Sequence, residues 1–225
     1  MHIEPGVVNG AKIVLSYATA AGVGSYTLKL GLAALRETGA AALTLRAGLA
    51  TAMTLFCFQV LPHHPVGVSE VHLILGSTLF LLFGAAPAAM GLALGLLTQG
   101  LLFAPTDLAQ YGMNVTSLLA PLFLMQAAAR RVIPRDRAYV DLRYAQVLKL
   151  SLVFQGGVVA WVAFWALYGG GFAAANLSAV AAFGAAYMTV VLLEPLVDLA
   201  VLAGAKALRG LRDSDLVTPR LHAPA

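Results

Sequence analysis

The sequence predicts an all-α protein, a polytopic membrane helix bundle with seven transmembrane helices and its N-terminus outside. Of the 225 residues, 60% are hydrophobic and 11% are charged, and the mean hydropathy is +0.84. So few charged side chains cannot coat a water-soluble globule of this size. A helix needs about 20 apolar residues to cross a bilayer, and we identify seven apolar stretches: 8–34, 40–62, 71–86, 87–104, 112–133, 147–168 and 177–205.

Glycine and alanine are dense in the predicted helices, as in 18–22 and 181–186. Small residues let membrane helices approach closely, so we expect close packing, with a docking face for another membrane subunit as the alternative. The stretches 71–86 and 87–104 are short and tightly joined. They could instead form one re-entrant hairpin, which would leave six helices.

The chain divides into a membrane domain and a tail. We expect residues 1–210 to form a single integral membrane domain. Residues 211–225 are predicted to be a disordered cytoplasmic tail, because this end segment is short and polar and contains two prolines.

The Lys and Arg residues orient the predicted bundle, because cytoplasmic loops of membrane proteins are rich in them. The loops 62–70, 104–111 and 169–176 contain none, and Arg36 and Arg46 lie near the joint of the first two stretches. This pattern predicts a multi-pass protein of the bacterial cytoplasmic (inner) membrane with its C-terminus inside. It also attributes the net charge of +4 to membrane orientation, so no nucleic acid is expected as a partner. The other basic residues that carry the pattern are Arg130, Arg131, Arg135, Arg137, Arg143, Lys149, Lys206, Arg209 and Arg212.

The first six residues contain the groups of a metal chelator. The α-amine of Met1, the deprotonated backbone nitrogen of His2 and Nδ1 of the His2 ring can close two fused rings around one divalent ion. Planar nitrogen sets suit Ni(II) and Cu(II), with Co(II) close in affinity. No cleavable signal is evident, so we expect Met1 to remain in the protein. A Met-His start also arises by chance, and a site would need a fourth nitrogen from elsewhere.

The fourth nitrogen is expected from a histidine, and the chain has five: His2, His63, His64, His72 and His222. His72 is the best candidate, because it begins an apolar helix at the predicted outer mouth of the bundle. Ser69 and Glu70 are close enough in sequence to fix the tautomer of its ring. His63 and His64 lie between prolines in an outer loop, as a solvated pair or a low-affinity metal-collecting site, and they remain the alternative source.

Polar residues inside the apolar stretches also need an explanation, because they are costly in a membrane. Asn114 begins the fifth stretch on the predicted side of His72, where it could bond a non-helical N-terminal segment. Glu194 and Asp198 are one helical turn apart on the last stretch. They support a second hypothesis, a proton-linked membrane carrier or an intramembrane enzyme. A haem or copper electron-transfer protein is a third, but no histidines face one another across the predicted helices.

At these residues the chain resembles the CbiM/NikM family, the substrate-binding S components of energy-coupling factor (ECF) transporters for cobalt and nickel. Family members begin Met-His-Ile followed by an acidic residue and glycine, and the first six residues are similar, with Pro5 inserted. Counting back from Phe83-Gly84 places the family's ligand histidine on His72. The chain departs from the family at Val71-His72-Leu73-Ile74-Leu75, where Ser-His-Pro-Thr-Gly is usual, and at Glu194-Pro195, where Glu-Gly is usual. Further matches are Gln99, Gly112-Met113-Asn114 and Glu194.

The resemblance implies a binding protein that captures Ni²⁺ or Co²⁺ as its transported substrate, without an organic cofactor. Its metal ligands would be Met1, His2 and His72. It is not expected to be an enzyme, because the sequence has no Gly-x-x-x-x-Gly-Lys-Ser/Thr loop for ATP. The resemblance implies as partners a transmembrane coupling (T) subunit, a pair of ABC ATPase subunits and a small accessory membrane subunit. The supporting residues would be Glu4, Ser69, Glu70 and Asn114.

Overall fold

A computed structural model describes residues 3, 6–212 and 214–224 of the chain. Within these residues, helices account for most of the structure and one short hairpin is inserted between the first two. The elements are α1 Ile13–Gln59, β1 His64–Val66, β2 Ser69–Val71, α2 Gly76–Phe83, α3 Ala85–Leu102, α4 Tyr111–Val132, α5 Tyr144–Gly170, α6 Ala174–Met188 and α7 Val190–Ala207. Short 3-10 helices join or flank them: η1 Gly10–Lys12, η2 Pro105–Gln110, η3 Tyr139–Asp141, η4 Arg209–Leu211 and η5 Pro219–Leu221.

Five helical spans in the described part of the chain are long and apolar enough to cross a membrane. The all-α class and the multi-pass membrane character are therefore confirmed. The seven-helix count is not confirmed, and an outside N-terminus remains a prediction. The five spans are Gly10–Gln59, Ala85–Leu102, Pro105–Val132, Tyr144–Gly170 and Ala174–Ala207.

The predicted stretch 71–86 does not form a spanning helix. Its helix, α2, has 8 residues, and at 1.5 Å per residue it is about 12 Å long, against about 30 Å for the hydrocarbon core of a bilayer. The preceding residues belong to β2 and to an irregular turn. An apolar composition therefore reflects burial here rather than a helix exposed to lipid.

The first two predicted stretches share one helix, α1, which bends sharply at Gly39. Gly39 has φ 82° and ψ 167°, a conformation that residues with a Cβ rarely adopt. The helical arms on either side, 13–38 and 40–59, correspond to the predicted stretches 8–34 and 40–62. At the other end of the chain, the predicted stretch 177–205 covers both α6 and α7.

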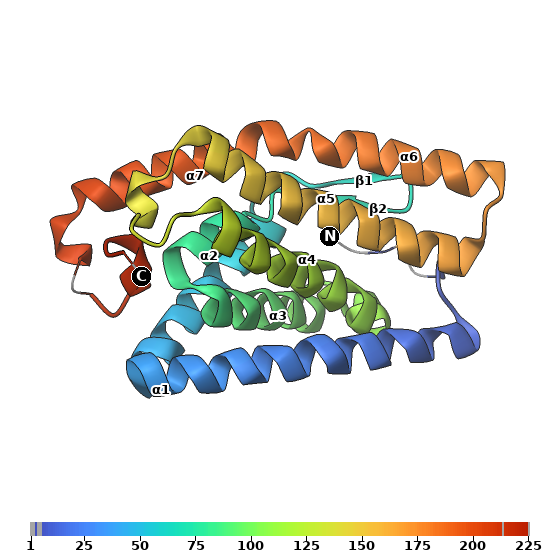
Figure 1. Cartoon of the computed structure of the whole chain (residues 1–225). Helices are drawn as coiled ribbons and strands as arrows, with labels where there is room; N and C mark the ends of the chain where they lie inside the picture. Colours follow the sequence, from blue (N-terminus) through green and yellow to red (C-terminus); the bar gives the residue numbers. More distant parts are fainter. Residues whose placement is uncertain (1–2, 4–5, 213, 225) are drawn as a thin grey trace.

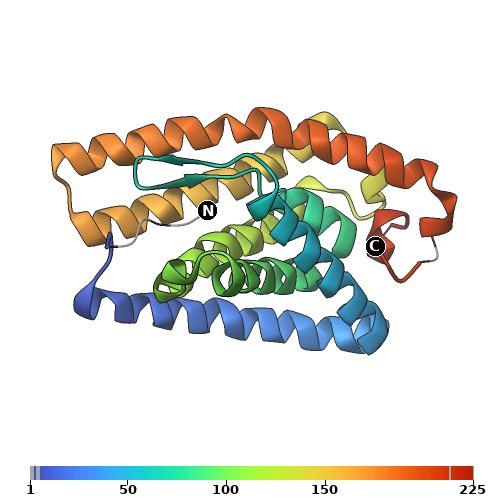
Figure 2. The ribbon, with the colours of Figure 1, turned by 180° about the vertical axis from the view of Figure 1, so that it is seen from behind.

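The helices pack as a bundle in which α3 and α4 lie between α1 on one side and α5, α6 and α7 on the other (Figures 1 and 2). Small residues allow the second arm of α1 to approach α3. A Cβ added at Gly91 would lie 2.3 Å from the Cβ of Ala50, and one at Gly95 would lie 2.6 Å from the Cβ of Thr54. Close backbone approach of this kind is a main source of helix association in membranes.

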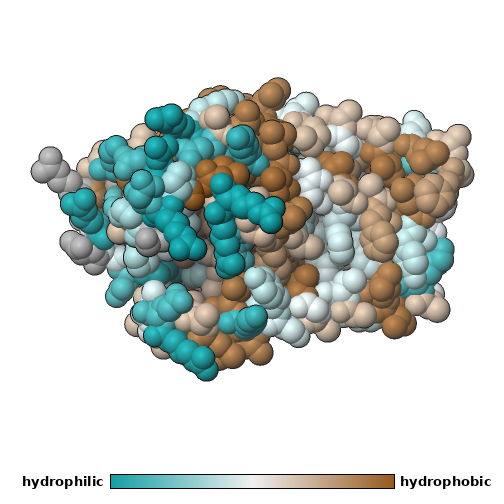
Figure 3. Space-filling view, viewed as in Figure 1, coloured by the Kyte–Doolittle hydropathy of each residue, from teal (hydrophilic) through white to brown (hydrophobic). Residues whose placement is uncertain are grey.

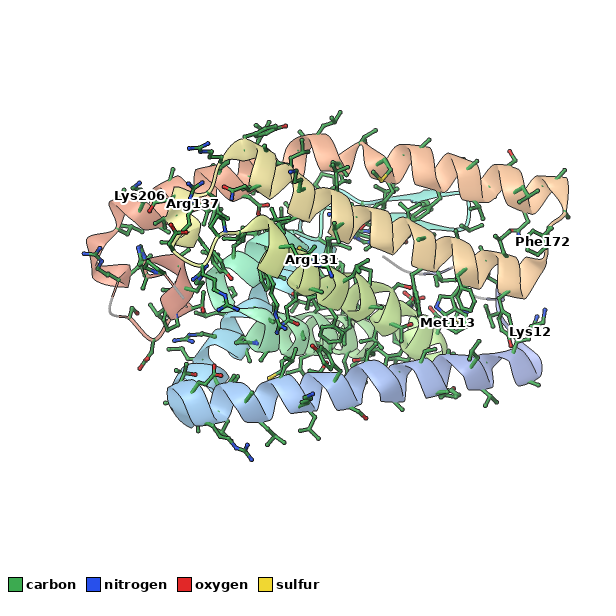
Figure 4. The ribbon with its side chains drawn as sticks, viewed as in Figure 1. Lys12, Met113, Arg131, Arg137, Phe172 and Lys206 are labelled. Carbon is green, nitrogen blue, oxygen red and sulfur yellow. The ribbon has the colours of Figure 1, made fainter. Side chains whose placement is uncertain are left out.

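One end of the bundle gathers most of the basic side chains. Arg137 and Lys206 lie at this end, whereas Lys12 and Phe172 lie at the opposite end (Figure 4). Hydrophilic residues crowd the same end of the molecular surface (Figure 3). We call this part, formed by residues 133–143, 206–212 and 214–224, the basic end. It contains the loops that the sequence assigns to the cytoplasm.

The described part of the C-terminal tail, residues 214–224, packs against the bundle, which corrects the expectation of disorder. The Thr218 backbone N–H donates to the Leu82 carbonyl at 2.7 Å. Val217 and Leu221 are buried. Burial of these two apolar side chains favours the folded-back position of the segment. The polar, proline-containing composition of the tail does not indicate it.

Candidate metal-binding site

The chain between α1 and α2 folds into a hairpin that runs beside α5 and α6 (Figures 1 and 2). Strands β1 and β2 pair antiparallel, with Pro65 opposite Glu70. At the hairpin turn, a Cβ on Gly67 would lie 2.1 Å from the Ala179 carbonyl oxygen of α6. Only glycine can therefore bring the turn this close to the helix. The predicted outer loop 62–70 is thus packed along the bundle.

His72 follows β2 directly and is buried, at 1% exposure. The sequence predicts that it begins a helix, but residues 72–75 are irregular and α2 begins at Gly76. Leu75 closes the turn with φ 58°, a left-handed conformation that is costly for a residue with a Cβ. The structure therefore places the imidazole in a buried turn between strand and helix.

Among the described residues, three side chains contact the His72 ring. Glu70 Oε2 lies 2.9 Å from His72 Nε2. In the neutral ring this contact places the proton on Nε2, which donates to the carboxylate, and leaves the lone pair on Nδ1. Phe58 meets the ring edge-on at 5.2 Å between centroids, and the His63 ring stacks on it at 5.0 Å with an interplanar angle of 14°.

The sequence does not predict the contact that His63 makes with His72. It is exposed, like its neighbour His64, but its ring lies parallel to that of His72 rather than free in a solvated loop. The hairpin produces this contact, since it brings the residues before β1 beside the residue after β2. Sequence spacing alone gives no sign of it.

Ile3 brings the N-terminal segment to β2. Its backbone N–H donates to Asn114 Oδ1 at 2.9 Å, and it forms an antiparallel bridge with Ser69. Ile3 is 1% exposed and Asn114 is 1% exposed, so this bond is sealed inside the bundle. Asn114 lies at the start of α4 and thus bonds a non-helical N-terminal segment, as the sequence predicts.

The remaining predicted residues are distributed as follows. Met1, His2 and Glu4 lie outside the described residues. His222 lies in the segment 214–224 at the basic end. Within the described part of the chain, no group of three or more His, Cys, Asp or Glu side chains could hold a metal ion. The described residues therefore bring two imidazoles together, those of His72 and His63.

Glu194 and Asp198 form a separate buried cluster on α7. Asp198 accepts hydrogen bonds from Ser77 Oγ, at 2.6 Å, and from Thr78 Oγ1, both at the start of α2. Glu194 Oε2 accepts from Ser151 Oγ and from Gln155 Nε2 of α5, the latter at 2.7 Å. The two carboxylates thereby connect α7 to α2 and α5.

Ser77 and Thr78 are functional candidates that sequence analysis does not single out. They lie five and six residues after His72 and fix the first turn of the helix into which the His72 turn leads. A Ser-Thr pair opening an otherwise apolar helix is the signal that points to a buried acceptor. Their bonds to Asp198 therefore stabilise the position at which the His72 turn ends.

Comparisons with known proteins agree with this architecture. A solved structure described as "Crystal Structure of an Truncated Transition metal Transporter" superposes with a TM-score of 0.64 at 18% sequence identity, covering 92% of this chain and 99% of its own. This likeness shows the shared fold. No curated protein sequence matches the chain. Residues 2–210 match the family model described as "CbiM: Cobalt uptake substrate-specific transmembrane region". Because this match covers nearly all of the sequence and confirms the resemblance seen in its motifs, the chain belongs to the CbiM family of cobalt-uptake membrane components.

Proposed function

We propose that the protein is the substrate-specificity (S) component of an ECF-type transporter, which binds Ni²⁺ or Co²⁺ from the outer side for ATP-driven uptake by partner subunits. The ion would be bound by the Met1 amine, the His2 backbone nitrogen, the His2 imidazole and His72 Nδ1. The observation that carries this proposal is the position of Ile3, held between Asn114 and Ser69.

The bonds of Ile3 hold the third residue of the chain beside β2. Ser69 lies on the same strand as Glu70, whose carboxylate contacts His72. Two residues of chain span at most about 7 Å, so a site formed with Met1 and His2 would have to lie within that reach of Ile3. The fold thus supports a site that combines the N-terminus with an imidazole about 70 residues later in the sequence.

The Glu70 contact supports the role of His72 as a ligand. A ligating histidine commonly donates its other ring N–H to a carboxylate, which fixes the tautomer and raises the basicity of the ligating nitrogen. Here Nε2 is the nitrogen that faces the carboxylate, so Nδ1 would face the ion. A set of four nitrogens favours Ni²⁺ and Co²⁺ over hard ions that prefer oxygen.

The partners follow from what the chain lacks and from its family. The sequence contains no phosphate-binding Gly-x-x-x-x-Gly-Lys-Ser/Thr loop, so energy would come from a transmembrane coupling (T) subunit and ABC ATPase subunits, with a small accessory membrane subunit. We propose a multi-pass protein of the bacterial inner membrane with its N-terminus outside. The gathering of arginines at the basic end supports the assignment of that end to the cytoplasm.

The alternative function, a proton-linked carrier or enzyme using Glu194 and Asp198, has less support. Both oxygens of Asp198 and one oxygen of Glu194 accept hydrogen bonds from side chains of neighbouring helices. These bonds give both carboxylates a structural role in joining three helices. We therefore assign them to positioning α2.

The proposal is tested by the metal content of the purified full chain with its native N-terminus. The protein would be dialysed against Ni²⁺, Co²⁺ or Mg²⁺ in turn, freed of unbound ion and measured by elemental mass spectrometry. One equivalent of Ni²⁺ or Co²⁺ and no Mg²⁺ is the expected result. Retention of Mg²⁺, or of no ion, would contradict the proposal.

A further inference from the structure

A cavity of about 890 Å³ opens at the basic end, between α1, the joint of α2 and α3, α4 and the C-terminal segment. Four arginines line it: Arg46, Arg130, Arg135 and Arg220. Among the described residues, Glu37 is the one carboxylate in the lining. The cavity therefore carries a strong excess of positive charge.

Arg46 is the most informative of the four, because its side chain is buried, whereas those of Arg130 and Arg135 are exposed. It is 5% exposed, and its Nε donates to the Asp215 backbone carbonyl at 2.9 Å. It forms no ion pair with any carboxylate of the described residues, and the Asp215 carboxylate acts on it only from a greater distance. A buried guanidinium without a close anion is costly, and an anion in the cavity would offset this cost.

The other arginines are arranged so that an anion could meet them. The Arg220 guanidinium donates to the carbonyls of Pro134 and Arg135 at 2.8 and 2.7 Å, and it lies 5.6 Å from the centre of the Tyr139 ring. These contacts fix it in place at the wall of the cavity. Arg130 and Arg135 are exposed, and among the described residues neither forms an ion pair. A guanidinium group can donate two parallel hydrogen bonds to two oxygens of one phosphate.

The rest of the wall is apolar. Leu30, Phe80, Phe83 and Ile133 line the same space. Free inorganic phosphate would gain nothing from such a surface, whereas a molecule with a phosphate group and hydrocarbon chains matches both parts of the lining. We infer that this cavity binds the phosphate headgroup of an anionic phospholipid at the basic end of the bundle.

The general abundance of basic residues at this end does not by itself explain why four arginines line one cavity. Arg131 and Lys149 are also exposed at or near the basic end, but neither lines the cavity. They provide a matched control, because their replacement by glutamine removes the same charge outside the cavity. The inference is independent of the metal site, and its test uses no metal.

The experiment measures lipid binding to the purified full chain by native mass spectrometry, with phosphatidylglycerol, phosphatidylcholine or inorganic phosphate as the probe. We expect phosphatidylglycerol to bind at least about tenfold more tightly than phosphatidylcholine. The double variant Arg130→Gln/Arg135→Gln, which keeps buried Arg46, should lose about tenfold in phosphatidylglycerol affinity, because each basic residue near a membrane surface contributes several-fold. The double variant Arg131→Gln/Lys149→Gln should keep the wild-type affinity.

Three results would overturn the inference. The two lipids could bind equally, which would exclude recognition of negative charge. The two double variants could lose affinity equally, which would mean attraction by surface charge in general. Inorganic phosphate could displace phosphatidylglycerol at equal concentration, which would identify an anion site without a lipid. Arg46→Gln would be compared in the same assay, with helical content measured by circular dichroism to detect a folding defect.

Discussion

At the scale of single residues, the account depends most on the His72 ring and its partners. We expect His72→Ala to weaken Ni²⁺ binding by more than about 100-fold, since even the loss of an outer partner of a metal ligand typically costs 10- to 100-fold. His64→Ala should change affinity little, because its side chain is exposed and makes no ring contact with His72. Calorimetric titration of each purified variant provides the measurement.

His63→Ala is the control that separates the two possible sources of the fourth nitrogen. The His63 ring stacks on His72, so its loss removes a packing contact and should reduce affinity only a few-fold. If His63→Ala abolished binding while His72→Ala kept it, the assignment of the ligand would be reversed.

Asn114 makes a second prediction at this scale. Asn114→Ala leaves the Ile3 N–H buried without its 2.9 Å acceptor, which should cost about 1–3 kcal/mol of stability. It should also lower Ni²⁺ affinity, because the N-terminal segment loses its attachment. Asn176→Ala is the matched control: it removes an amide that bonds the carbonyls of Ala166 and Gly171.

Thermal unfolding and Ni²⁺ titration of both asparagine variants test whether the bond to Ile3 matters for metal affinity as well as for stability. Both should be less stable, but only Asn114→Ala should lose affinity. An unchanged affinity in Asn114→Ala would mean that the position of Ile3 does not matter to the site.

At the scale of secondary structure, the short helix α2 is held by α7 through Asp198. In Asp198→Ala the hydroxyls of Ser77 and Thr78 lose their acceptor, and leaving buried polar groups without partners costs about 1–3 kcal/mol each. We expect a lower thermal unfolding temperature together with weaker Ni²⁺ binding, since the His72 turn leads directly into α2. Leu196→Ala, on the exposed side of the same helix, should change neither quantity appreciably. If both substitutions changed stability and Ni²⁺ affinity equally, Asp198 would have no specific role in holding α2.

The sequence predicts the helices well and the turns between them poorly, for physical reasons. Membrane insertion depends on summed hydropathy, so the long spans are evident from composition. The stretch 71–86 is apolar because it is buried, and hydropathy cannot distinguish a buried turn plus a short helix from a spanning helix. The bend at Gly39 falls in the gap that the sequence leaves between the stretches 8–34 and 40–62, so this break was predictable from hydropathy.

The candidate site shows the same division. His72 is visible because histidine is scarce, and Asn114 because amides are costly in apolar helices. The contact of His63 with His72 depends on the hairpin, whose close approach to α6 at Gly67 is a tertiary feature. Ser77 and Thr78 lie 121 and 120 positions before Asp198 in the sequence. The Ser-Thr pair indicates a buried acceptor, but no local pattern identifies Asp198 as that acceptor.

At the scale of the whole molecule, metal capture should depend steeply on pH. The proposed ligands bind only as neutral imidazoles, a free amine and a deprotonated backbone nitrogen, so binding releases protons. Imidazoles and α-amines ordinarily lose their protons near pH 6.5 and 8, respectively, as approximate values. Affinity should therefore rise as pH increases from about 5.5 to 8, with several protons released per ion. Nickel titration in buffers of different ionisation enthalpy counts those protons. An affinity independent of pH would instead indicate oxygen ligands such as Glu4, Glu70 or Asp107.

The central claim is that the N-terminus of the chain is itself the chelator. The most direct test compares Ni²⁺ binding by two forms of the full chain, one with a free Met1 amine and one with an acetyl group or short tag there, each carrying the same C-terminal purification tag. Blocking removes one ligand and hinders deprotonation of the next backbone nitrogen. We expect the blocked form to keep its helical content and to lose the ion, together with the yellow, diamagnetic signature of square-planar Ni²⁺. Equal binding by the free and blocked forms would contradict the account.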